Sequence, residues 1–194
     1  MTTPRIGIIL STTREGRFAD KPAAWLQEIA AQRTDLSFEL IDLRDYPLPM
    51  FDYPFSPART AIEDDHVLPW RNKLASLDGF LFITAEYNHS IPAVLKNAID
   101  HAYAEFVRKP AGFLGYGNAA GARAIEHLRM ICIEMQMAPS RFAVQVSREL
   151  LVAVLREGKT LDDFPNLRDQ AIAVLDDLGW WATTLKLGRE RTAA

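Results

Sequence analysis

The chain is poor in cysteine. Its 194 residues include one, Cys132, which excludes an intramolecular disulfide and any metal site built from several cysteines. The four histidines do not lie at metal-ligand spacing from carboxylates or from the cysteine, so we expect no metal. Cys132 falls on an apolar helical stripe, which predicts a buried thiol rather than a reactive one.

The chain also lacks a strong charge of either sign. It has 22 Lys and Arg against 25 Asp and Glu, a net charge of −3. Nucleic-acid binding through bulk charge is not expected, because it needs a clustered basic surface. No apolar run approaches the roughly 20 residues of a membrane span, and Met1–Pro4 lead directly into an apolar segment without the basic region of a secretory signal. We therefore expect a cytoplasmic protein with no membrane span and no nucleic-acid partner.

The remaining composition is that of a globular protein. Hydrophobic residues make up 48% of the chain and charged residues 24%, values typical of a soluble domain. A chain of this length buries roughly 70% of its unfolded surface, so it needs no disulfide or metal to stabilise a core. We predict a single domain spanning residues 1–194.

Short apolar segments alternate with segments whose apolar residues recur at helical spacing. We expect Asp20 to cap the first helix and Asp162 or Asp163 to cap the last. Four prolines between Tyr46 and Pro57 preclude a helix there and predict a long loop. The predicted strands are residues 5–10, 38–41, 79–84, 111–116 and 142–146, and the predicted helices are residues 18–29, 67–77, 93–106, 125–135 and 167–185.

This alternation predicts an α/β fold. Strands that are apolar on both faces and alternate with helices form a parallel sheet covered on both sides. Five such units fit a flavodoxin-like three-layer sandwich with a five-stranded parallel sheet in the order 2-1-3-4-5. Ligands of such sheets bind outside the carboxyl ends of the strands, so we expect the loops after strands 1, 3 and 4 to converge on one site.

The loop after the first predicted strand, residues 11–17, is rich in hydroxyl groups and arginines. It leads into a helix N-terminus, where free N–H groups and the helix dipole favour an anion. Arg14 and Arg17 can add charge-assisted hydrogen bonds to phosphate oxygens. These features predict a phosphate site, with a solvated polar turn as the alternative. The loop is neither a Walker A loop nor a GxGxxG motif.

Two further loops have features of a ring-binding site. In the loop of residues 85–92, an aromatic residue is followed by Asn and Ser, a combination suited to a flat heteroaromatic ring, with a helix-capping turn as the alternative. The loop of residues 115–121 contains three glycines, which allow backbone to approach a ligand closely. Arg123 follows this loop and is left open between a phosphate contact and solvent.

Taken together, three segments resemble the NADPH-dependent FMN reductase family, whose members include flavodoxin-like NAD(P)H:quinone and azo reductases. They are RIGIILSTTREGR, FITAEYNHSIPAVLKNAIDHAY and GYGNAAGARAIEHLRMICIEM, and the resemblance runs from about residue 5 to residue 146. This chain has Ser11 where the family usually has Gly, and Ala85 where it usually has Pro. For the FMN phosphate the resemblance implies Ser11, Thr12, Thr13, Arg14, Gly16, Arg17 and Phe18. For the isoalloxazine and ribityl it implies Ala85, Glu86, Tyr87, Asn88 and Ser90, with Gly115, Tyr116 and Gly117 approaching the ring from the third loop.

The resemblance also implies an activity. An FMN-dependent oxidoreductase of this kind takes a hydride from NAD(P)H onto bound FMN and passes electrons to an acceptor such as a quinone, a flavin or an azo compound, in a ping-pong scheme. The flavin carries the chemistry, so we assign no catalytic side chain. The choice between NADPH and NADH stays open, as does the acceptor. A flavodoxin-like electron carrier and a binding protein that has lost flavin are the alternatives.

Assembly is a further implication, because family members are commonly dimers or tetramers with flavin at the subunit boundary. We therefore expect a homodimer or homotetramer. The proline-bearing loop after the second strand holds too many apolar groups for a solvated loop, Met50 and Phe51 among them. We hypothesise that this loop covers the partner's flavin or lines the substrate pocket.

Overall fold

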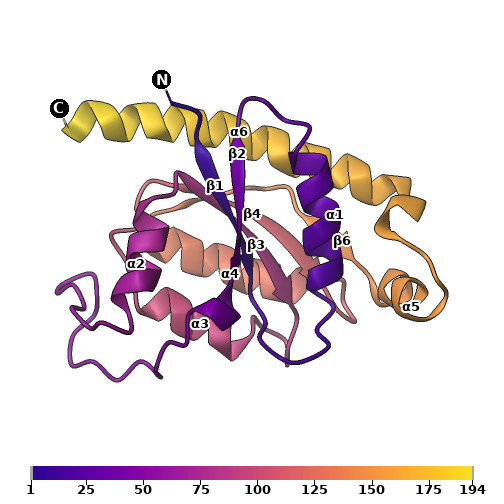
Figure 1. The fold of residues 1–194 in the computed structure, drawn as a ribbon, viewed down its shortest axis with the longest axis horizontal. Helices are drawn as coiled ribbons and strands as arrows, with labels where there is room; N and C mark the ends of the chain where they lie inside the picture. The colour runs from indigo at the N-terminus through magenta and orange to yellow at the C-terminus, as the bar shows by residue number, and fades with distance from the viewer. Residues whose placement is uncertain (1, 194) are drawn as a thin grey trace.

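The computed structural model describes residues 2–193 and is built around a parallel sheet (Figure 1). The strand order is β2-β1-β3-β4-β5, with β6 also paired to β4, which confirms the predicted flavodoxin-like order 2-1-3-4-5. The strands are β1 (Arg5–Leu10), β2 (Ser37–Asp42), β3 (Gly79–Ala85), β4 (Pro110–Tyr116), β5 (Ala138–Pro139) and β6 (Val144–Val146). The helices are α1 (Asp20–Ala30), α2 (Leu68–Ala75), α3 (Ala93–Asp100), α4 (Ala122–Glu134), α5 (Arg148–Arg156) and α6 (Pro165–Ala193), with short 3₁₀ helices η1 (Leu43–Asp45) and η2 (Leu161–Asp163).

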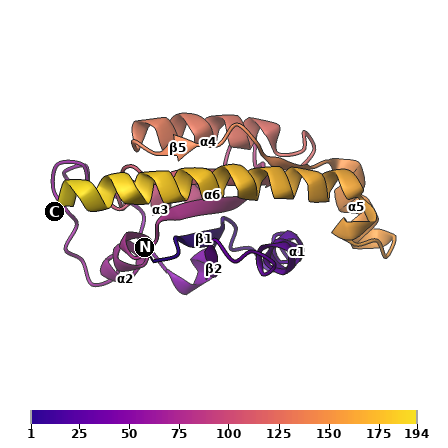
Figure 2. The same ribbon diagram turned by 90° about the horizontal axis from the view of Figure 1, so that it is seen from above.

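Helices cover both faces of the sheet, as expected of strands that are apolar on both sides. One buried cluster joins α1 and α6 to one face, and a second joins α2, α3 and α4 to the other. Figures 1 and 2 show α6 running along the length of the molecule, with α5 at the end far from the chain termini. No helix among residues 2–193 is long and apolar enough to cross a membrane.

The third predicted helix is wrong at its C-terminal end. α3 ends at Asp100, and residues 101–107 form turns. Ala102 and Phe106 are nevertheless buried, so they follow the predicted apolar spacing without helical backbone. Glu105 holds the turns by accepting one hydrogen bond from the Tyr103 N–H within the segment and one from Arg71 of α2.

The fifth predicted strand is split in two. β5 pairs with the start of β4 and β6 with its end, and residues 140–143 lie outside both. Ser140 at the interruption donates to Asp177 of α6, while Arg129 of α4 donates to the Ser140 carbonyl. Phe142, predicted to begin the strand, is instead 45% exposed.

Two predicted caps are also wrong, and one helix was not predicted. Ala19 occupies the N-cap of α1, and Asp20, in the first turn, pairs with Arg17 instead. Asp163 closes a capping box on η2 rather than on α6. The helix that the sequence pattern did not reveal is α5, whose one buried residue is Val154.

Candidate functional site

The three predicted loops meet at the carboxyl edge of the sheet. They line an open pocket of about 220 Å³ together with part of α5. Eight of the fifteen residues predicted to bind FMN line it: Arg14, Gly16, Phe18, Ala85, Glu86, Tyr87, Tyr116 and Gly117. The strands place these loops, because the carboxyl ends of parallel neighbours share one edge of the sheet.

Arg17, predicted to bind the FMN phosphate, is paired with two carboxylates in the structure. Its side chain is 1% exposed and lies between Asp20 and Asp42, with the Nη2 atom 2.6 Å and 2.5 Å from their carboxylate oxygens. It also donates to the Thr12 carbonyl. Burial opposes ionisation of Asp42, but hydrogen bonds from Arg17 and Arg44 outweigh it and hold the pKa of Asp42 well below its usual range. Arg17 therefore fixes the shape of the loop from its buried side.

The solvent-facing side of the same loop has the hydrogen-bond donors of an anion site. Within residues 2–193, the backbone N–H groups of residues 12–18 donate to no protein acceptor. Arg14 is exposed, and it forms no ion pair in the described part of the chain. The Ser11 hydroxyl is buried and has no hydrogen-bond partner among the described residues. Free N–H groups beside an unpaired guanidinium are the donors that a phosphate group requires.

The second loop is a tight turn. Tyr87 and Ser90 exchange backbone hydrogen bonds of 2.9 Å and 3.0 Å, and the residues between them, Asn88 and His89, have φ values of +48° and +74°. Positive φ at both central positions is the pattern of a type I′ turn, which Asn tolerates well. The turn leaves the Tyr87 side chain 37% exposed at the pocket.

Polar contacts tie this turn to α4. The Glu86 carboxylate accepts hydrogen bonds from Arg123, at 2.6 Å from Nε and 3.2 Å from the backbone N–H, and its side chain is only 4% exposed. His127 lies 2.9 Å from the Ser90 hydroxyl. The sequence left open whether Arg123 contacts a phosphate or solvent. In the structure Arg123 pairs with Glu86 and holds the second loop against α4.

Tyr116 links the first loop to the third. Its ring packs edge-on against Phe18 with centroids 5.1 Å apart, and its hydroxyl lies 3.5 Å from that of Thr12. Burial raises the pKa of Tyr116 to about 12, so the phenol stays neutral and available as a donor at neutral pH.

The glycines of the third loop have different roles. Gly117, with φ +149°, lies at the pocket, where a Cβ would be 3.1 Å from Glu86 Cβ. Gly115, predicted to approach the ring, lies inside β4, and a Cβ there would be 2.7 Å from Ile125. The absence of a side chain at Gly115 therefore lets α4 pack against the strand.

Three further residues that the sequence motifs did not predict line the pocket, namely Asn118, Leu151 and Leu155. Leu151 and Leu155 belong to α5, which starts directly after β6 at the same edge of the sheet. The available signal was positional, because the segment after a fifth parallel strand leaves at the edge where the other loops converge.

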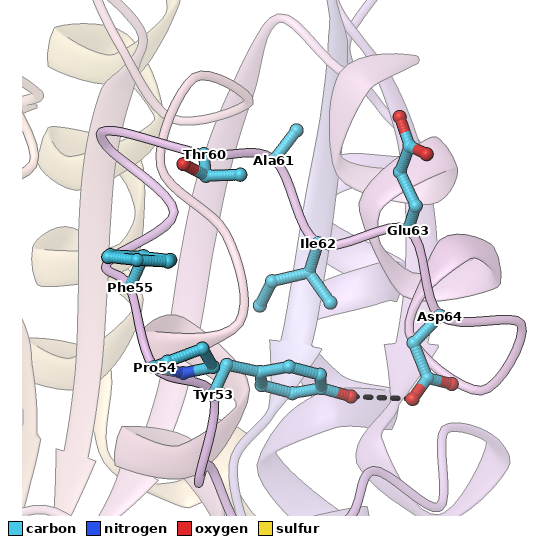
Figure 3. A pocket seen from close by; sticks show the side chains of 8 residues that line it. All are labelled: Tyr53, Pro54, Phe55, Thr60, Ala61, Ile62, Glu63 and Asp64. Carbon is cyan, nitrogen blue, oxygen red and sulfur yellow. Dashed lines mark hydrogen bonds between the residues drawn. The ribbon is translucent and has the colours of Figure 1, made fainter.

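The proline-rich loop has two parts, of which Tyr46, Pro47 and Leu48 line a pocket together with Thr13 of the first loop, while residues 53–55 lie apart from the three-loop pocket. Tyr53, Pro54 and Phe55 face Ile62 across a larger, mainly apolar pocket of about 430 Å³, and the Tyr53 hydroxyl donates to Asp64 at 2.7 Å (Figure 3). Asn97 of α3 anchors the loop by accepting from the Phe51 N–H. All the residues that line this pocket come from residues 53–64, and none of them lines the three-loop pocket.

Cys132 is buried in the core, as predicted. Its side chain is 1% exposed, and burial raises its thiol pKa to about 12. The thiol therefore stays protonated at neutral pH and serves packing.

The sheet order and the convergence of three loops at its carboxyl edge define a flavodoxin-like α/β protein. The sequence profile of the family described as NADPH-dependent FMN reductase matches residues 4–149. An NAD(P)H-dependent FMN reductase of Schizosaccharomyces pombe is 34% identical over 154 residues, 77% of each chain. A 2-hydroxy-1,4-benzoquinone reductase of a Burkholderia species is 31% identical over 135 residues, 66% of this chain and 69% of that one. The structure of FerB, a flavoenzyme NAD(P)H:(acceptor) oxidoreductase from Paracoccus denitrificans, superposes with a TM-score of 0.70 at 24% identity, covering 93% of this chain and 98% of that one.

The chain belongs to the NADPH-dependent FMN reductase family. It is therefore an oxidoreductase with FMN as its cofactor and NAD(P)H as its co-substrate, as the resemblance implied.

Proposed function

We propose that this protein passes electrons from NAD(P)H, through FMN bound at the three-loop pocket, to a small organic acceptor of the quinone, flavin or azo class. The observation that carries the proposal is the convergence of the three loops on one open pocket at the carboxyl edge of the sheet. With a quinone the reaction balances, because NAD(P)H gives up a hydride and the quinone takes two electrons and two protons, one from solvent, to become a hydroquinone.

The first loop would hold the FMN phosphate. Its free N–H groups and the N-terminus of α1 attract an anion, and Arg14 would add a charge-assisted hydrogen bond. Ser11 and Thr12 are buried within the loop, and Thr13 is exposed on it. Arg17 acts by shaping the loop, since its guanidinium is taken up by Asp20 and Asp42.

The second and third loops would hold the isoalloxazine. When bound, FMN supplies the two-electron chemistry. Tyr87 and Tyr116 offer aromatic surface to a flat ring, and Gly117 lets the backbone come close. N–H groups of the turn at Asn88 would stabilise negative charge on a flavin ring bound beside the turn. The pocket is open, so a second substrate can reach the ring.

We further propose that the protein works in the cytoplasm as a homodimer or homotetramer. The proposal of assembly is supported by apolar side chains exposed on the proline-rich loop, where Met50 is 75% and Phe55 is 60% exposed. Isolated apolar groups are common on surfaces, but several on one loop favour a protein contact.

The direct test is the visible absorption spectrum of the purified protein, recorded anaerobically before and after FMN and then after NADPH. We expect a flavin spectrum that persists through gel filtration and is bleached by NADPH. A protein that retains no FMN would contradict the proposal and favour a binding protein. One that retains FMN without bleaching by NADPH or NADH would be an electron carrier.

A further inference from the structure

The three-loop pocket has an apolar wall on one side. Leu151 and Leu155 of α5 line it together with the three loops. The family profile ends at residue 149, so both leucines lie beyond the matched segment. The wall therefore lies outside the segment that carries the family motifs.

The position of α5 is fixed at both ends. Ser147 caps its first turn by accepting from the Leu150 N–H, and Val154 is buried at 8% exposure. After the helix, Leu161 is buried and Asp162 accepts a hydrogen bond of 3.0 Å from the Trp25 indole. These contacts hold the helix beside the pocket.

Packing of the core does not account for Leu155. Its side chain is 50% exposed, while the rest of the exposed surface of α5 is largely polar, including Arg148, Glu149 and Arg156. An aliphatic side chain at the mouth of a pocket offers no hydrogen bond to replace lost hydration. A charged molecule pressed against it loses solvation without compensation, whereas an uncharged ring gains from the contact.

We propose that Leu155 is a specificity-determining residue that favours uncharged aromatic acceptors over charged ones, with Leu151 packed against the core behind it. The inference rests on the proposed function, because it assumes that acceptors reach FMN in this pocket. On this account α5 sets the acceptor specificity, and the three loops bind FMN.

The test compares two acceptors that share a ring and differ in charge, 1,4-naphthoquinone and 1,4-naphthoquinone-2-sulfonate, with the FMN-loaded enzyme at saturating NADPH. Leu155→Ser should lower kcat/KM for the uncharged quinone roughly tenfold and leave that for the sulfonate unchanged. Leu155→Lys should reverse the preference. Leu155→Met, which keeps an apolar side chain, should restore the wild-type ratio.

The matched control is Ile172→Ser on α6, since Ile172 is an aliphatic residue of similar exposure, 44%, that does not line the pocket. It should leave both acceptors unaffected. An unchanged acceptor ratio in Leu155→Ser and Leu155→Lys would overturn the inference while leaving the proposed function intact. A loss of FMN affinity in these variants without a change in ratio would also overturn it, because Leu155 would then serve the cofactor. A wild-type protein that binds no FMN would refute the proposed function itself.

Discussion

At the scale of single residues, the site depends on which charged groups are paired and which are free. Arg17 and Arg14 lie three positions apart on the same loop, yet one is buried between two carboxylates and the other is exposed. Buried charges need such partners, because removing one partner leaves the other uncompensated in a poorly solvated place. The two arginines therefore have separable effects, one on stability and one on ligand binding.

Replacing Arg17 with Met should destabilise the fold. It removes the buried cation between Asp20 and Asp42 and leaves them only the half-exposed Arg44, so we expect the free energy of unfolding to fall by about 2 kcal/mol. Urea denaturation at pH 7 measures this. Arg14→Ala is the control and should stay within about 0.5 kcal/mol of wild type. Equal stabilities for the two variants would contradict this account of the loop.

Cys132 should make stability depend on alkaline pH. Burial raises its pKa to about 12 in the folded state, against about 8.5 when unfolded. Between these values the unfolded chain binds fewer protons, so stability falls as pH rises. We expect wild type to lose about 2 kcal/mol more than Cys132→Ala between pH 8 and pH 10, measured by urea denaturation with a reductant present. Equal losses would show that the thiol does not carry the effect.

At the scale of elements, loops at strand ends do more than connect helices. The first loop keeps free N–H groups because Arg17 holds its backbone, and the second keeps its turn because α4 binds it through Glu86 and Ser90. Each loop is therefore held by an element distant in the chain, and the rigidity of the site comes from these tertiary contacts.

Arg14→Ala should weaken FMN binding. A charge-assisted hydrogen bond contributes about 1.5–3 kcal/mol, so we expect the Kd for FMN to rise roughly 10- to 100-fold. Quenching of flavin fluorescence on titration measures it, with riboflavin, which lacks the phosphate, as a ligand control. Arg59→Ala removes an equal charge from an exposed site outside the pocket and should leave the Kd unchanged. An equal loss of affinity for FMN and riboflavin would place Arg14 away from the phosphate.

At the scale of the whole molecule, the open pocket and the exposed apolar side chains are the features that assembly would explain. Met50 projects from a loop whose backbone is anchored to α3 on both sides, since Asn97 bonds the Pro49 carbonyl and the Phe51 N–H. An anchored loop that presents an exposed methionine is suited to a contact with another copy of the chain or with substrate.

Met50→Asp should therefore change either assembly or kinetics. We expect a lower molar mass by light scattering after gel filtration, or a higher KM for the acceptor, because a charge on an apolar contact is costly to desolvate. Ile172→Asp places the same charge on an exposed apolar site of α6 as the control. Wild-type mass together with wild-type kinetics in Met50→Asp would refute the hypothesis that this loop covers a flavin or lines a substrate pocket.

The sequence by itself determined the parallel sheet, the order of its first four strands with the helices between them, and the edge at which the site forms. Apolar spacing reports local backbone geometry, and chain order decides which loops share an edge. Only the tertiary structure decided the partners of Arg17, the break between β5 and β6, and the presence of Leu151 and Leu155 at the pocket. These features depend on contacts between residues far apart in the chain, such as Arg17 with Asp42 and Ser140 with Asp177, and no local pattern of residue types encodes such contacts.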